Sequence, residues 1–146
     1  MTTSRTYRKL NIADMSMVLQ MENDFRSDLV SEENARQFLS NRMNWLFACI
    51  EDGRIIAFVY GYELNRLKSQ GNILYIHEVA VLPAFHRQGI GREMLTHVKA
   101  LCKLSGICRF FLFTERSNTA ACGLYNAMGG KPAHEDSVVY FFNDLD

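Results

Sequence analysis

Two glycines stand two residues apart where the sequence pattern changes from strand to helix. The segment Arg87-Gln-Gly-Ile-Gly91 follows an apolar run that stops at Pro83, and an amphipathic stretch begins at Gly91. Glycines at a helix N-terminus let backbone N–H groups approach an anion closely, and the helix dipole favours the negative charge. The segment lacks the Gly-Lys-Ser/Thr ending of a P-loop and the Gly-x-Gly-x-x-Gly pattern of dinucleotide folds. It therefore fits an anion site, with a plain strand-to-helix turn as the alternative.

An acidic residue, Glu78, interrupts the apolar run before this turn. Simple alternation gives two largely apolar faces, with Leu74, Ile76, Glu78, Ala80 and Leu82 on one and Tyr75, His77, Val79 and Val81 on the other. Two apolar faces predict a strand buried in the middle of a sheet. Burial raises the pKa of a carboxyl group toward the range that suits a general base. Glu78 is therefore a candidate base, or else a salt-bridged structural glutamate. On the opposite face, His77 could join the same centre only through a β-bulge, and a core histidine is the simpler interpretation.

These residues need a scaffold, and the hydrophobic pattern outlines one. Asn11 and Ser31 are typical helix N-caps, Asp52-Gly53 is a typical hairpin turn, and Gly106 is a typical helix stop. The pattern predicts strands over residues 6–10, 45–51, 54–63, 73–82, 108–114 and 137–142. It predicts helices over residues 11–25, 31–41, 91–105 and 118–128. This order mixes hairpins with crossover helices, which indicates an α+β fold with helices on both faces of a mixed sheet.

The composition limits the classes of protein to consider. The chain has 146 residues, 48% of them hydrophobic, and 16 basic residues balance 16 acidic ones. We expect a single domain over residues 1–146, with no nucleic-acid partner because there is no basic excess. No apolar run is long enough to span a membrane, and the first residues lack the apolar core of a signal peptide. The four cysteines form no Cys-x-x-Cys pair, and His97 and His134 have no second ligand at metal spacing. We therefore expect a cytoplasmic protein that binds no membrane and no metal.

At the glycine turn the chain resembles the GCN5-related N-acetyltransferase (GNAT) superfamily. Val81-Leu-Pro83 and Arg87-Gln-Gly-Ile-Gly91 match the family motif, Arg/Gln-x-x-Gly-x-Gly/Ala, although His86 takes the first position, where Arg or Gln is usual. The resemblance implies a mixed, mostly antiparallel sheet of six to seven strands flanked by four helices. It also implies that the turn holds the pyrophosphate of acetyl-CoA. The residues of this turn are His86, Arg87, Gln88, Gly89, Ile90, Gly91 and Arg92.

A second segment, beginning Asn118-Thr-Ala-Ala-Cys-Gly-Leu-Tyr125, resembles the family's later motif. Tyr125 also lies in an apolar helical stripe, so a core position is the alternative for this residue. The resemblance implies that Asn118 contributes to cofactor binding and that Tyr125 binds the cofactor and protonates the departing CoA thiolate. It further implies that the Glu78 strand separates from its neighbour. Its free backbone groups would then pair with the pantetheine arm. These groups belong to Val79, Ala80 and Val81.

The acceptor is expected to be a small cationic amine. Acidic residues gather between positions 22 and 33 and at the end of the chain, and such a rim would attract a polycation. Candidate substrate-binding residues are Asp24, Asp28, Glu78 and Asp144, with an ordinary solvated surface as the alternative. The chain also resembles the small aminoglycoside 3-N-acetyltransferases through Trp45-Leu-Phe-Ala, the Ile73–Val81 block and the ending from Val138. Other possibilities are acetylation of a polyamine, a small metabolite or a protein N-terminus, and a sensor that binds acetyl-CoA without turnover. Members of the family often pair, so a homodimer is possible.

Overall fold

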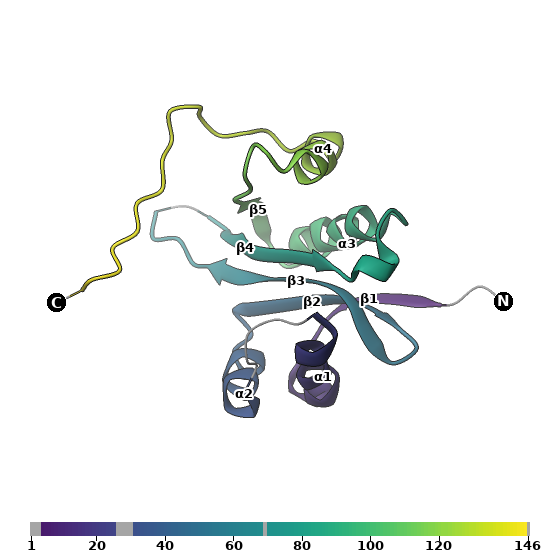
Figure 1. The fold of residues 1–146 in the computed structure, drawn as a ribbon. Helices are drawn as coiled ribbons and strands as arrows, with labels where there is room; N and C mark the ends of the chain where they lie inside the picture. The colour runs from purple at the N-terminus through teal and green to yellow at the C-terminus, as the bar shows by residue number, and fades with distance from the viewer. Residues whose placement is uncertain (1–3, 26–30, 69, 146) are drawn as a thin grey trace. The chain divides into compact units, whose positions relative to one another are not determined.

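The protein is described by a computed structural model over residues 4–25, 31–68 and 70–145. The chain divides into two compact units, Met1–Phe113 and Thr114–Asp146. The described residues of the first unit form five strands and three α-helices (Figure 1). Its strands are β1 (Arg5–Lys9), β2 (Asn44–Glu51), β3 (Arg54–Leu64), β4 (Asn72–Val81) and β5 (Ile107–Leu112). Its helices are α1 (Met15–Phe25), α2 (Glu32–Ser40) and α3 (Ile90–Leu104), with short 3-10 turns at Ile12–Asp14 and Pro83–Phe85.

The five strands form one mixed sheet in the order β1-β2-β3-β4-β5. The first four strands pair antiparallel, and β5 pairs parallel with β4. Helix α3 makes the crossover between these two parallel strands, as a parallel connection requires. The α+β class is therefore confirmed, with four α-helices in the described part of the chain once α4 of the second unit is included.

Helices cover both faces of this sheet (Figure 1). On one face, Val18 and Met21 of α1 and Leu39 of α2 pack with Leu46 and Phe58 of the sheet. On the other face, α3 is buried along one side through Ile90, Met94, Leu95, Val98 and Cys102. Burial of these apolar side chains is the main force that holds the two layers together.

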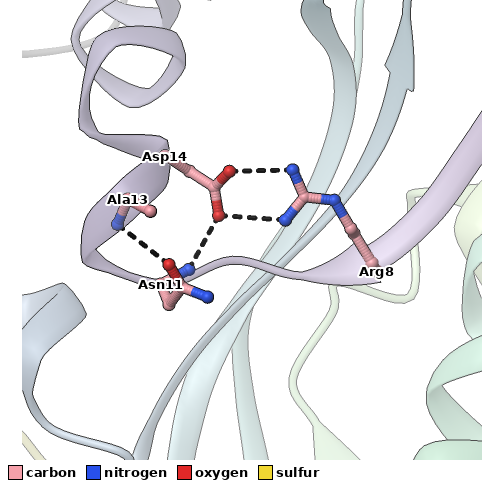
Figure 2. Close-up of polar contacts among 4 residues, drawn as sticks. All are labelled: Arg8, Asn11, Ala13 and Asp14. Atoms are coloured by element: carbon pink, nitrogen blue, oxygen red, sulfur yellow. Dashed lines mark hydrogen bonds and ion pairs between the residues drawn. The ribbon is translucent and has the colours of Figure 1, made fainter.

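Local sequence signals determine where the elements begin. Asn11 caps the first turn and forms a reciprocal capping box with Asp14, whose carboxylate also makes two hydrogen bonds with Arg8 (Figure 2). The Arg8 guanidinium lowers the pKa of Asp14, chiefly through these bonds. Ser31 caps α2, and both Asp52 and Gly53 adopt the positive φ of a tight hairpin turn. These predicted boundaries are confirmed.

The second unit contains one helix, α4 (Thr119–Ala127), which Asn118 caps by accepting a hydrogen bond from the Ala121 N–H. The strand predicted over residues 137–142 is wrong, because these residues lie in no strand and Val138–Phe142 are exposed. A strand needs a hydrogen-bonding partner, and this unit contains no other strand among its described residues. The described sheet therefore has five strands, where six to seven were expected.

Candidate active site

A β-bulge divides β4. Tyr60 pairs with Glu78 and Gly61 pairs with Ile76, so His77 is an extra residue that has no partner on β3. Gly61 permits this arrangement, because a Cβ at this position would overlap the Tyr75 carbonyl oxygen and lie 2.9 Å from the Ile76 Cα. The register therefore depends on a glycine in the neighbouring strand.

The bulge changes the predicted positions of Glu78 and His77. Both side chains are exposed, whereas sequence alternation predicted a buried Glu78 and placed His77 on the opposite face. A bulge adds one residue and so breaks the two-residue repeat, which brings both residues to the face that carries Tyr60. The bulge that was required for His77 and Glu78 to share one face is therefore present.

Polar contacts link this face of β4 to β3. The Tyr75 hydroxyl and His77 Nδ1 form a 2.9 Å hydrogen bond, and the His77 ring lies 5.2 Å from the Tyr60 ring. Burial raises the pKa of Tyr60, and the negative charge of Glu78 raises it further. The Glu78 carboxylate is thus close enough to Tyr60 to interact with it electrostatically.

The second half of β4 has no pairing with β5, because β5 ends first, and the separation that the family resemblance implied stays a prediction. Pairing between these strands ends at Ile76 and Leu112, while β4 continues to Val81 with β3 as its described partner. Alternate residues of a strand direct their backbone groups to opposite edges. The stretch that contains Val79, Ala80 and Val81 therefore directs part of its backbone toward an edge that no described strand occupies.

The glycine turn leads from this stretch into α3. Gly89 is the N-cap of α3 with φ of +76°, and Arg87 also has a positive φ. No described side chain caps this terminus, whereas Ser31 caps α2 and Asn118 caps α4. The first N–H groups of a helix have no acceptor within the helix. The amides of Ile90, Gly91 and Arg92 consequently form a positive end that suits an anion.

Two side chains hold the turn in place. His86 Nε2 lies 2.8 Å from the Val81 carbonyl oxygen, so His86 ties the turn to the end of β4. Arg5 of β1 donates hydrogen bonds to the side chains of both Gln88 and Glu51. The side chains of His86 and Gln88 thus contact the protein itself, and the His86 N–H donates to the Pro83 carbonyl oxygen.

The other predicted site residues belong to both units of the chain. Tyr125 and Asn118 belong to the second unit, where Tyr125 is half-buried and burial raises the pKa of its phenol. Asp24 lies 3.8 Å from Arg54, and Asp144 is exposed. Asp28 lies outside the described residues.

The described residues contain neither a cluster of metal-binding side chains nor a helix that could span a membrane. No three His, Cys, Asp or Glu side chains in this part of the chain gather where they could hold a metal ion. No described helix is long and apolar enough to cross a membrane. The absence of a bound metal remains a prediction.

The mixed sheet, with β4 continuing past β5 and leading into a helix that has no side-chain cap, defines the α+β class of this fold. The Acetyltransferase (GNAT) family model matches residues 8–129, and the chain belongs to this family. Members of this family are acetyltransferases that use acetyl-CoA.

Solved structures share the fold at low sequence identity. An aminoglycoside acetyltransferase from an uncultured soil metagenomic sample, in complex with trehalose, has a TM-score of 0.80 and 21% identity, and 97% of each chain is covered. Aminoglycoside N-acetyltransferase AAC(6')-Iy in complex with CoA has a TM-score of 0.76 and 14% identity, covering 100% of this chain and 98% of that one. At these identities the similarity supports the fold.

Curated relatives carry a different description. The [ribosomal protein bS18]-alanine N-acetyltransferase of Salmonella typhimurium is 30% identical over 76 residues, which is 44% of this chain and 51% of the relative. The Escherichia coli K12 protein of the same description is 35% identical over 54 residues, covering 37% of this chain and 36% of the relative. The matched part thus spans about half or less of these relatives.

Proposed function

We propose that this protein transfers the acetyl group of acetyl-CoA to the 3-amino group of an aminoglycoside by direct attack of the amine. The single observation that carries the transfer chemistry is the continuous path from the bulge of β4 to the uncapped N-terminus of α3. This path offers an exposed carboxylate, a strand edge without a described partner strand and a positive helix end in sequence order. Those three groups suit an amine, a pantetheine arm and a pyrophosphate, respectively.

Each part of the path has a task in this proposal. The backbone from Arg87 to Arg92 binds the pyrophosphate, and the backbone of Val79, Ala80 and Val81 pairs with the pantetheine arm. Glu78 accepts the proton from the acceptor ammonium, directly or through a water, and the free amine attacks the thioester carbonyl. The Val79 N–H stabilises the developing oxyanion. The carbon–sulfur bond then breaks, and the CoA thiolate leaves with a proton.

Tyr125 supplies that proton in the proposed mechanism. Because burial raises the pKa of Tyr125, the phenol stays protonated across the neutral range and is available as a donor. Tyr125→Phe is expected to lower kcat by roughly 10- to 10⁴-fold with little change in the affinity for acetyl-CoA. Steady-state kinetics with both substrates varied tests this role. An unchanged kcat would remove Tyr125 from the reaction.

The acceptor is inferred from the sequence resemblance and from the aminoglycoside acetyltransferases among the structural neighbours. A protein N-terminus is the second candidate, because the curated relatives are described as ribosomal protein alanine acetyltransferases. The acidic rim gives limited support to a polycation. Asp24 is engaged with Arg54, which offsets part of its charge.

The test is release of CoA from acetyl-CoA in the presence of gentamicin, spermidine or a short peptide with a free N-terminal alanine. Turnover with gentamicin alone is the expected result, followed by mapping of the acetylated nitrogen. Turnover with the peptide alone would replace the aminoglycoside by a protein N-terminus. Tight binding of acetyl-CoA without release on any amine would overturn the catalytic proposal and favour a sensor.

A further inference from the structure

We infer that the acceptor amine binds on an exposed aromatic surface beside Glu78, with its carbon frame against the rings and its ammonium group toward the carboxylate. The inference rests on the proposed amine acetylation and adds the binding surface and the recognition chemistry. The aromatic surface consists of Tyr60, Tyr62, Tyr75, His77, Phe111 and Phe113.

The aromatic surface is continuous across three strands. Tyr62 of β3 stacks with Tyr75 of β4 at a centroid distance of 6.3 Å, and Tyr75 stacks with Phe111 of β5 at 5.3 Å. Phe113 meets Tyr75 edge-on at 5.9 Å, and His77 meets Tyr60 at 5.2 Å. Cross-strand register accounts for this alignment, because Tyr62 pairs with Tyr75 and Tyr75 pairs with Phe111. The rings therefore support one another as a pre-formed surface.

Much of this surface faces solvent at the end near β5. Phe113 is 63% exposed and Phe111 is 37% exposed, although large aromatic side chains are usually well buried. By contrast, Phe58 on the same face of β3 is buried against Phe25 of α1. Core packing accounts for Phe58, but it does not account for Phe111 and Phe113. A row of rings that is covered at one end and exposed at the other is suited to ligand contact.

The charges around the rings favour a cation. Glu78 adds a full negative charge where it acts on Tyr60. Arg109 also belongs to this side of the sheet, but it pairs with Ile73, five positions before Glu78 along β4. An amine is therefore drawn to the Glu78 end, which is also where the pairing of β4 with β5 has ended.

The shape of the surface favours a rigid carbon frame in the acceptor over a flexible one. Tyr62, Tyr75 and Phe111 are stacked against one another, with interplanar angles of 25° and 26°, and so present a ridged apolar area made of ring edges. A cyclic amine can cover such an area with one rigid face, whereas a flexible linear amine loses more conformational entropy on binding. We therefore expect a ring-shaped cationic acceptor to be preferred over a linear one.

The experiment measures binding and turnover separately. Phe111→Ala, Phe113→Ala and the double variant would be titrated with gentamicin by calorimetry in the presence of CoA, and then assayed by CoA release. Each single change is expected to raise the Kd for gentamicin about 3- to 30-fold while the Kd for CoA stays within about twofold. Leu104→Ala is the matched control, because Leu104 is an 85% exposed apolar residue at the end of α3. This variant should leave both constants unchanged.

The outcomes separate this inference from the proposed function. Weakened gentamicin binding in the variants, with no turnover by the unaltered protein, would support the surface and contradict catalysis. Normal turnover with an unchanged Kd for gentamicin in the double variant would contradict the surface alone. Absence of gentamicin binding by the unaltered protein would also overturn the inference. If the variants change their oligomeric state in sedimentation while amine binding stays the same, the aromatic surface would instead be assigned to contact with a second copy of the chain.

Discussion

The two halves of β4 have the same neighbour on one side but different environments. From Asn72 to Ile76 the strand is hydrogen-bonded to both β3 and β5, and Leu74 and Ile76 are buried. From His77 to Val81 its described partner is β3, and both His77 and Glu78 are exposed. A single strand thus belongs to the core at its beginning and to the candidate site at its end.

The bulge opposite Gly61 marks the boundary between these halves. Before the bulge, alternate side chains are packed in the core. A truncation of one of them should therefore lower the free energy of unfolding. After the bulge, the side chains of His77 and Glu78 are exposed at the proposed site, and a change in either should act on kinetics. The proposed division of labour can therefore be tested by substitutions on either side of the bulge.

The largest effect is expected from Glu78→Gln in the second half of β4. Loss of the proposed general base should lower kcat by about 10²- to 10⁴-fold, and the acidic limb of the pH–rate profile should flatten. Stability should change little because Glu78 is exposed. Kinetics across pH and urea unfolding measure the two quantities. Asp52→Asn, an exposed charge removal in the β2–β3 turn, is the control. Persistence of the same acidic limb would identify another base.

The sequence predicted the features that depend on neighbouring residues. Asn11 and Ser31 cap their helices, and Asp52-Gly53 forms its turn, because each acts within a few residues. Gly89 and Gly91 likewise predicted free backbone N–H groups at the start of α3. The exposure of Glu78 could not be predicted by alternation, since the bulge arises between strands. Gly61 was the available signal, because a glycine within a strand often accompanies a bulge or a close backbone approach.

The next effect is expected on stability, from Leu74→Ala in the first half of β4. Leu74 is 0% exposed, so its truncation leaves a cavity and should lower the free energy of unfolding by about 2–5 kcal/mol. Once corrected for the folded fraction, kcat should stay close to that of the unaltered protein. Urea unfolding and active-site titration with acetyl-CoA provide the two measurements. A large loss of kcat in fully folded protein would show that the two halves are not independent.

A substitution at the boundary should affect both quantities. In Gly61→Ala the new methyl group meets the Tyr75 carbonyl and the Ile76 Cα, so the strands must move apart or the bulge must shift. We expect a loss of about 1–3 kcal/mol in stability, together with a lower kcat because Glu78 moves. Gly123→Ala in α4 is the control, since nothing lies within 4 Å of a Cβ there and alanine favours a helix. Normal kcat in Gly61→Ala would mean that the bulge does not position Glu78.

The smallest effect concerns the end of β4, where His86 holds the Val81 carbonyl oxygen at 2.8 Å. Because the carbonyl accepts, His86 must donate from Nε2, and it can do so in one neutral tautomer and in the protonated form. His86→Phe removes the donor but keeps an aromatic ring. An exposed hydrogen bond contributes about 0.5–1.5 kcal/mol, so the KM for acetyl-CoA should rise about 2- to 10-fold with kcat unchanged.

His86→Gln distinguishes a loss of this hydrogen bond from a loss of ring packing. The glutamine side chain has an N–H donor that can reach a nearby carbonyl, and Gln is also usual at this motif position in the family that the sequence resembles. We expect it to restore most of the acetyl-CoA affinity that His86→Phe loses. Equal KM values for the two variants would show that the bond to Val81 does not position the turn. In that case the second half of β4 would present its backbone to the cofactor without help from the turn that follows it.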